Sequence, residues 1–193
     1  MSSGRFSRYA YWASLGRNSA LLDKSGLTYG EEPIVDKEKL LTLFSLLGAS
    51  KRLGIGTGRP RVEAITPLTR WGAMDFVDKD TIITYQDVHE AQTALQKENP
   101  GLSLTKPHPY VFLRGVFQSS LRDEDLIAGL YDKEKCRKTL VVGDALCDLL
   151  AAKAAGCDFA AVLTGIDGEM ARSYFEAEKA DYILHNILEL LES

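Results

Sequence analysis

Residues 139–156 constrain the fold of this chain most, because in order they read as a buried strand, a turn and a helix. Residues 140–142 form a continuous apolar run, which is typical of a strand covered on both faces, and Gly143 ends that run. Residues 148–155 are strong helix formers, and Gly156 is placed to cap the helix at its carboxyl end. This stretch predicts one strand and one helix of a parallel, helix-covered sheet.

Two acids occupy the turn of this stretch. Asp144 would sit at the carboxyl end of the strand, where ligands gather in open parallel sheets, and Asp148 at the start of the helix would face the same crevice. Two converging carboxylates favour a hard, oxygen-seeking cation such as Mg²⁺. The alternative is that Asp148 only caps the helix and Asp144 only turns the chain.

Composition bounds the class of protein. At 193 residues the chain is long enough for one α/β domain with an appended segment. A net charge of −4 without a block of like charges argues against nucleic acid or a membrane surface as the partner and favours small soluble ligands. Three cysteines without a Cys-x-x-Cys pair indicate neither a disulfide framework nor a zinc site, so we expect a cytoplasmic protein. No apolar run approaches the roughly 18 residues of a membrane helix.

The amino-terminal third contains two helical patterns and a turn. Apolar residues recur at helical spacing over residues 9–22, where three arginines and no acid also resemble a transit peptide. Asp36 is placed to cap a helix that ends at Gly48. Residues 53–56 predict a short strand that runs into Thr57-Gly58-Arg59-Pro60. This turn offers a hydroxyl and flexible backbone amides to a phosphate, unless Thr57 serves only as a cap. The apolar face of the helix is expected at Leu40, Leu41, Phe44, Leu46 and Leu47.

The remainder continues the alternation of strands and helices. Residues 81–84 predict a strand. Pro107 and Pro109 fix the backbone around Lys106 just before a helix, so its rigidly presented ammonium could neutralise an anion bound near Asp144. The alternative is an ordinary solvated lysine on the surface. Further strands are expected over residues 159–163 and 182–184, and helices over 168–178 and 187–191. The predicted class is therefore α/β with a doubly wound parallel sheet.

Three motifs in order carry a family resemblance: Gly56-Thr57-Gly58-Arg59-Pro60, then Lys106-Pro107-x-Pro109, then Gly143-Asp144-x-x-x-Asp148. Together they resemble the haloacid dehalogenase (HAD) superfamily of hydrolases, in the form of phosphatases with a helical cap and a Rossmann-like core. The resemblance implies that Thr57 and Gly58 bind the substrate phosphate and that Asp144 and Asp148 hold Mg²⁺. It also implies that Lys106 contacts the phosphate and that Lys106 and Asp144 act in catalysis.

Family members also carry an Asp-x-Asp at the end of the first strand, whose first acid is the nucleophile, and this sequence does not have it before Thr57. The only such spacing near an apolar run, Asp78-Lys79-Asp80, lies between the Thr57 and Lys106 motifs, where the nucleophile does not belong. We therefore expect residues 1–33 to be a cap remnant with a linker, and residues 34–193 to be a HAD-like core lacking its first strand.

The resemblance leads to a function and an alternative. The first is a Mg²⁺-dependent phosphomonoester hydrolase acting on a small phosphorylated metabolite, present as a carboxyl-terminal fragment that is inactive alone. The alternative is a non-catalytic module that binds phosphate or regulates. The absent strand would lie between the strands that end at Thr57 and at Asp144. The chain is then expected to close the sheet directly, to borrow a strand from its first 35 residues or a second copy, or to need a complementing amino-terminal segment. Residues 5–15 are the most apolar candidate for the borrowed strand.

Overall fold

The computed structural model describes residues 30–191. The chain divides into two units, Met1–Glu32 and Pro33–Ser193. The helix expected over residues 9–22 and the proposed cap remnant lie almost entirely outside the described residues.

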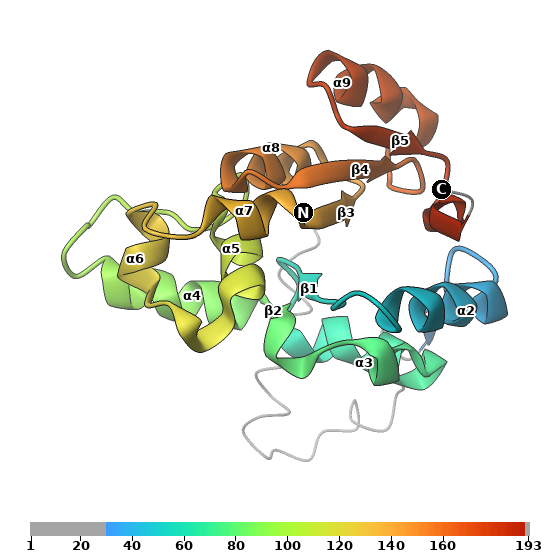
Figure 1. The fold of residues 1–193 in the computed structure, drawn as a ribbon, viewed down its shortest axis with the longest axis horizontal. Coiled ribbons are helices and arrows are strands. Elements are labelled where there is room, and N and C mark those ends of the chain that lie inside the picture. Colours follow the sequence, from blue (N-terminus) through green and yellow to red (C-terminus); the bar gives the residue numbers. More distant parts are fainter. Residues whose placement is uncertain (1–29, 192–193) are drawn as a thin grey trace, which may run out of the picture. The chain divides into compact units, whose positions relative to one another are not determined.

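The described strands pair in parallel throughout, but they form two sheets instead of one (Figure 1). The first sheet joins β1 (Ile55–Gly56) to β2 (Ile82–Ile83), with Ile55 opposite Ile82. The second has the order β3-β4-β5 and consists of β3 (Leu140–Gly143), β4 (Asp158–Val162) and β5 (Tyr182–Leu184). Among the described residues β1 and β3 do not pair, so the chain does not close the sheet directly.

Helices and 3₁₀ turns alternate with these strands, and the α/β class with parallel strands is confirmed. The α-helices are α2 (Lys37–Gly48), α3 (Arg61–Trp71), α4 (Tyr85–Leu95), α5 (Tyr110–Phe117), α6 (Asp123–Ile127), α7 (Lys133–Arg137), α8 (Leu146–Ala155) and α9 (Arg172–Ala177). The 3₁₀ turns are η2 (Ala73–Phe76), η3 (Lys79–Thr81), η4 (Gln118–Ser120), η5 (Gly168–Ala171) and η6 (Ile187–Leu191).

Local sequence signals set several of these boundaries. The Asp36 carboxylate accepts a hydrogen bond from the Lys39 backbone N–H at 2.9 Å and so caps α2, as predicted. Gly156 has φ of +82° at the end of α8, a conformation that costs glycine little. Thr84 and Asp87 form a capping box at the start of α4, a helix that the sequence analysis did not predict.

Two expectations about these elements were wrong. The prediction that β3 is covered on both faces fails, because Leu140 is 41% exposed while its neighbour β4 buries Phe159 completely. In α2 the buried face includes Leu43, which was not predicted, whereas Leu46, which was predicted on that face, is 59% exposed. The closing helix expected over residues 187–191 is present as a 3₁₀ helix, Ile187–Leu191.

The core lies between the second sheet and the helices α4, α5 and α8. Leu149 and Ala152 of α8, Phe159 of β4 and Leu113 of α5 belong to one buried cluster. Helix α5 contacts both strands of the first sheet and also α8, which contacts β3 and β4. Helix α5 therefore links the two sheets and fixes how the carboxyl end of β1 is placed relative to that of β3.

Candidate functional site

The centre of the candidate site is the ammonium group of Lys106. It donates to the Asp148 carboxylate Oδ1 at 2.6 Å and to the backbone carbonyl of Gly56 at 3.1 Å. Gly56 ends β1, and Asp148 lies in the first turn of α8, just beyond β3. The side chains of Lys106 and Asp148 are only 17% and 13% exposed. One half-buried cation therefore bridges the carboxyl ends of strands from both sheets.

The residues around Lys106 hold its side chain in this position. Pro107 and Pro109 follow it, and α5 begins at Tyr110. The Phe112 ring of α5 lies with its centroid 5.2 Å from the Lys106 nitrogen, within cation–π range. Phe112 also packs so closely on β1 that a Cβ at Gly56 would come within 3.0 Å of the ring. A larger residue at position 56 would therefore require the Phe112 ring to move by a few tenths of an ångström.

Asp144 and Asp148 lie on either side of the turn that follows β3. The Asp148 carboxylate folds back over the strand end, where a Cβ at Gly143 would come within 2.9 Å of its Oδ2. Asp144 lies against the loop after β4, where a Cβ at Gly165 would come within 2.7 Å of its Oδ2. Because Gly143 and Gly165 have no side chain, the carboxylates of Asp148 and Asp144 can lie directly against the backbone at these two positions.

The turn after β1 lies on the other side of Lys106. The Thr57 backbone N–H donates to the Ile83 carbonyl at 2.9 Å, which anchors the turn to β2. The Thr57 Oγ1 accepts a hydrogen bond from the Arg59 backbone N–H at 3.1 Å, and among the described residues its hydroxyl proton is donated to no acceptor. A Cβ at Gly58 would meet nothing within 4 Å, so space is open beside the turn.

The four predicted side chains therefore lie at the carboxyl ends of β1 and β3, but the contacts between them are unequal. Lys106 contacts Asp148 directly, whereas Thr57 is adjacent in sequence to the Gly56 carbonyl that Lys106 also contacts, and Asp144 is adjacent to Gly143. The sequence analysis expected the ammonium to face an anion near Asp144. In the structure it is bound by Asp148.

The carboxylates fit a partly hydrated Mg²⁺ but do not form a complete ligand cage. Within residues 30–191 no group of three or more His, Cys, Asp or Glu side chains could hold a metal. Mg²⁺ usually keeps several waters and takes only one or two carboxylates from the protein. Asp144 and Asp148 meet that smaller requirement, although one oxygen of Asp148 already accepts from Lys106.

Three further residues shape this site: Gly56, Phe112 and Gly165. Gly56 belongs to the first motif, but no contact was predicted for it or for the other two, because nothing in a linear sequence indicates which glycine faces which carboxylate or ring. Asp78 lies just before β2, at the opposite end of that strand from Thr84. It accepts from the Asp80 backbone N–H at 3.1 Å and so begins a 3₁₀ turn.

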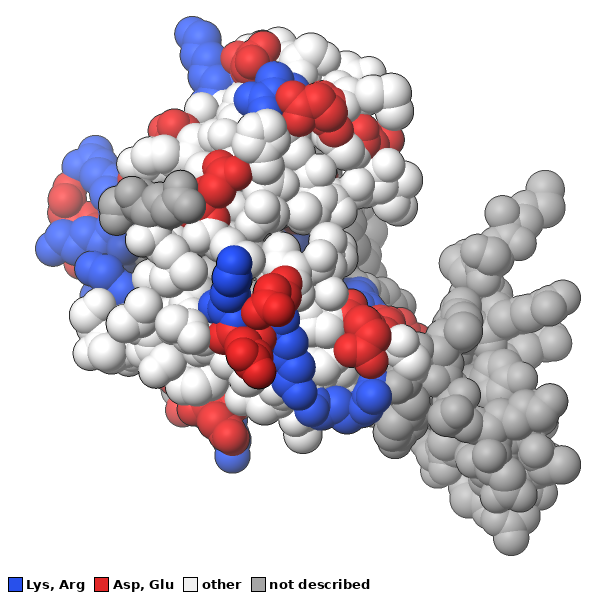
Figure 2. Space-filling view, turned by 90° about the vertical axis from the view of Figure 1, so that its right-hand side faces the viewer, with Lys and Arg blue, Asp and Glu red and all other residues white. Residues whose placement is uncertain are grey.

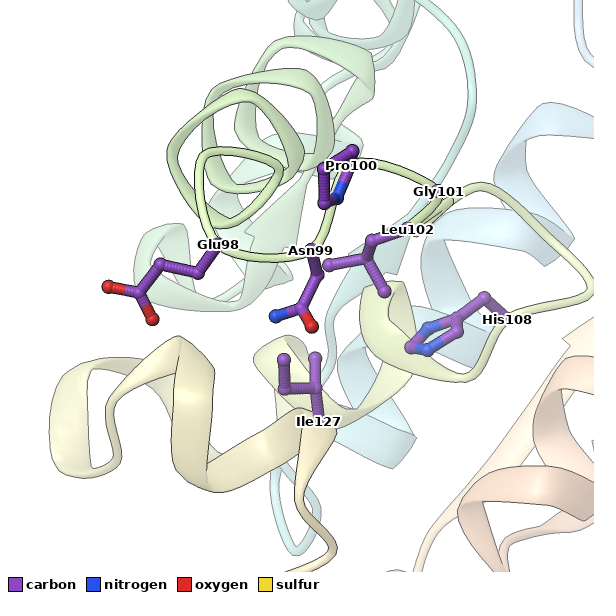
Figure 3. Close-up of a pocket in the computed structure, with 7 residues that line it drawn as sticks. All are labelled: Glu98, Asn99, Pro100, Gly101, Leu102, His108 and Ile127. Atoms are coloured by element: carbon purple, nitrogen blue, oxygen red, sulfur yellow. The ribbon is translucent and has the colours of Figure 1, made fainter.

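Two surface pockets lie away from these residues. One of about 530 Å³ is lined by Glu98, Asn99, Pro100, Gly101, Leu102, His108 and Ile127 (Figure 3). Figure 3 shows the side chains of Asn99, His108 and Ile127 pointing toward the same space. Burial lowers the pKa of His108, whose Nδ1 accepts from the Tyr110 backbone N–H at 3.1 Å. The second pocket, of about 680 Å³, lies between α4 and α5. Neither pocket includes Lys106, Asp144 or Asp148. We therefore place the candidate site at the strand ends because the lysine and the two carboxylates lie there.

The surface does not concentrate charge of one sign on the face in Figure 2, where basic and acidic side chains lie next to one another. Among residues 30–191, no helix is long and apolar enough to cross a membrane. Cys136, Cys147 and Cys157 are free thiols.

The parallel α/β fold and the site at the strand ends define a class of protein. Comparison with known proteins shows that this class is HAD-like. Residues 104–190 match the family model described as HAD-hydrolase-like. An X-ray structure from the Northeast Structural Genomics Consortium is 30% identical, with a TM-score of 0.81 over 95% of this chain. A haloacid dehalogenase-like protein of unknown function from Agrobacterium tumefaciens strain C58 is 16% identical, with a TM-score of 0.53, and supports the fold alone. No curated protein matches the chain significantly.

Residues 104–190 of this chain form a HAD-hydrolase-like domain. The chain spans about half the length of the first matching structure, 48%, and 73% of the second.

Proposed function

We propose that this chain provides the lysine, the metal-binding acids and the phosphate-binding turn of a Mg²⁺-dependent phosphomonoester hydrolase. The observation that carries the proposal is the half-buried Lys106 ammonium, which is held between the Gly56 carbonyl and Asp148. A rigid cation at strand ends suits the reaction, because phosphoryl transfer depends on positioning and charge neutralisation. The substrate class is a small phosphorylated metabolite.

Each residue has a task in this proposal. The Thr57 hydroxyl and the Gly58 backbone N–H donate to the nonbridging phosphate oxygens. Lys106 holds the phosphate by charge and also keeps the Asp148 carboxylate oriented, at 2.6 Å. Asp144 and Asp148 are the residues that would hold Mg²⁺, which when bound neutralises charge on the phosphate.

We further expect that residues 1–193 do not turn over phosphomonoesters alone. In the family that this chain resembles, the nucleophile is the first aspartate of an Asp-x-Asp at the end of the first strand, which comes before the Thr57 turn in the chain. This sequence has no Asp-x-Asp before Thr57. In the described residues the only carboxylate bound to Lys106 is Asp148. The assignment of residues 1–33 to a cap remnant belongs to the same proposal.

The test combines turnover with phosphate binding. The purified chain should not hydrolyse p-nitrophenyl phosphate with Mg²⁺, yet it should bind inorganic phosphate in calorimetry. Lys106→Met should weaken phosphate binding at least tenfold, and Lys97→Met, which changes a lysine in another loop, should leave it unchanged. Equal phosphate binding by wild type and Lys106→Met would refute the site. Robust turnover by the chain that Asp78→Asn abolishes would show that the Asp78 motif is the nucleophile.

The lack of an Asp-x-Asp before Thr57 favours one alternative, a module that binds phosphate without catalysis. Adding a carboxylate-bearing amino-terminal segment from a full-length relative separates the two functions. Turnover then appears if the chain is part of a hydrolase, and does not appear if the module has no catalytic role.

A further inference from the structure

The pocket of about 530 Å³ in Figure 3 lies between the loop after α4, the loop before α5 and the end of α6. Hydrogen bonds within each loop fix its walls. The Gln96 amide donates to the Leu102 carbonyl at 2.7 Å, and the Leu102 N–H donates to the Asn99 carbonyl at 2.9 Å. The His108 N–H donates to the Thr105 carbonyl at 2.9 Å. A pocket formed in this way needs little further ordering of the protein when a ligand binds.

The side-chain amide of Asn99 offers this pocket one donor group and one acceptor. Figure 3 shows it pointing toward the same space as the side chains of His108 and Ile127. Within residues 30–191 this amide makes no hydrogen bond to another residue. A free carboxamide can pair through both of its groups with a ligand edge that carries a donor beside an acceptor, as asparagine does with adenine.

The His108 ring adds a second donor. Its Nδ1 accepts from the Tyr110 backbone N–H at 3.1 Å, so the proton of the neutral ring lies on Nε2. Burial lowers the pKa of His108 from 6.5, so the ring is uncharged at neutral pH. Among the described residues Nε2 has no hydrogen-bond partner, and its N–H is therefore available to an acceptor on a ligand.

The rest of the lining favours an uncharged ligand with apolar faces. No lysine or arginine lines the pocket, and the ionised side chain in its lining is the carboxylate of Glu98, which repels an anion. Leu102 and Ile127 are half-buried and supply apolar surface. The volume of about 530 Å³ lies within the range of about 300–1,000 Å³ that is usual for small organic ligands.

We propose that this pocket binds the base of an adenine nucleoside that carries no phosphate. The 6-amino group of adenine lies beside a ring nitrogen that accepts, and this pair matches the two groups of the Asn99 amide. Another ring nitrogen accepts from the His108 Nε2–H, and the faces of the base pack against Leu102 and Ile127. Lys106, Asp144 and Asp148 do not line the pocket, so this site is separate from the one at the strand ends.

Calorimetry with adenosine on the full chain tests the proposal. Adenosine should bind, and purine riboside, which lacks the 6-amino group, should bind at least tenfold more weakly. Asn99→Leu keeps the size of the side chain but removes both of its hydrogen-bonding groups, and should weaken adenosine binding at least tenfold. The same change at Asn186, in the loop after β5, should leave binding unchanged. The proposal would be overturned by no binding of adenosine, by equal binding of purine riboside or of the Asn99→Leu variant, or by tighter binding of cytidine.

A second measurement locates the ligand without any variant. In NMR spectra of the wild-type chain, adenosine should shift the signals of the Gly101 N–H and the His108 ring, and leave those of the Thr57 and Gly58 amides in place. Shifts confined to Thr57 and Gly58 would assign adenosine to the strand ends and overturn the proposal. Neither measurement uses phosphatase activity or phosphate binding, so the result is independent of the proposed function.

Discussion

The ion pair between Lys106 and Asp148 should stabilise the fold as well as form the site. Breaking a buried pair costs about 3–5 kcal/mol, because one charge is left without a partner, whereas an exposed pair contributes about 0–1 kcal/mol. With 17% and 13% of the two side chains exposed, this pair lies nearer the buried case. We expect Lys106→Met to lower the free energy of unfolding by about 2–3 kcal/mol, which lowers Tm by about 5–10 °C in a unit of this size.

A double-mutant cycle measured by urea unfolding checks the value. Asp148→Asn should cost a similar amount, and the double variant should cost less than the sum of the two single variants by at least 1 kcal/mol, because the second change removes a charge that has already lost its partner. Arg137→Met is the matched control, since its pair with Glu134 has 67% and 61% exposed side chains and should contribute well under 1 kcal/mol. Additive single effects, or a loss no larger than that of the control, would refute the reasoning.

Three further predictions follow from the same geometry. Calorimetry should find weak Mg²⁺ binding to the chain that Asp144→Asn reduces at least tenfold, and tight binding unaffected by that change would contradict the assignment. Gly165→Ala should destabilise the chain by about 1–2 kcal/mol in thermal unfolding, since its Cβ would lie 2.7 Å from the Asp144 Oδ2, whereas Gly101→Ala has open space and should be nearly neutral. Burial holds the pKa of His108 below 6.5, so the unfolded chain binds a proton first, and stability should fall as pH drops below about 6.5. Protonation of His108 would also break the hydrogen bond that its Nδ1 accepts from the Tyr110 N–H. His108→Gln should therefore make stability depend less on pH in this range, because glutamine takes up no proton.

Short-range signals were enough for several elements. The apolar run before Gly143 predicted β3, the residues Tyr182–Leu184 predicted β5, and Asp36 and Gly156 marked the ends of α2 and α8. Each depends on interactions within a few residues, such as a cap or an αL glycine. Helix α4 was missed although its capping box, Thr84 with Asp87, was present in the sequence.

The sequence by itself determined the order of the motifs, the parallel α/β class and the chemical type of each site residue, because these follow from local periodicity and side-chain chemistry. The tertiary structure alone decided that Lys106 pairs with Asp148, 42 residues away, and with the Gly56 carbonyl, 50 residues away. It also decided that Gly165 makes room for Asp144, and that β1 and β3 end in separate sheets. Contacts between distant residues depend on how helices such as α5 pack across strands, and no pattern within a short stretch specifies that packing.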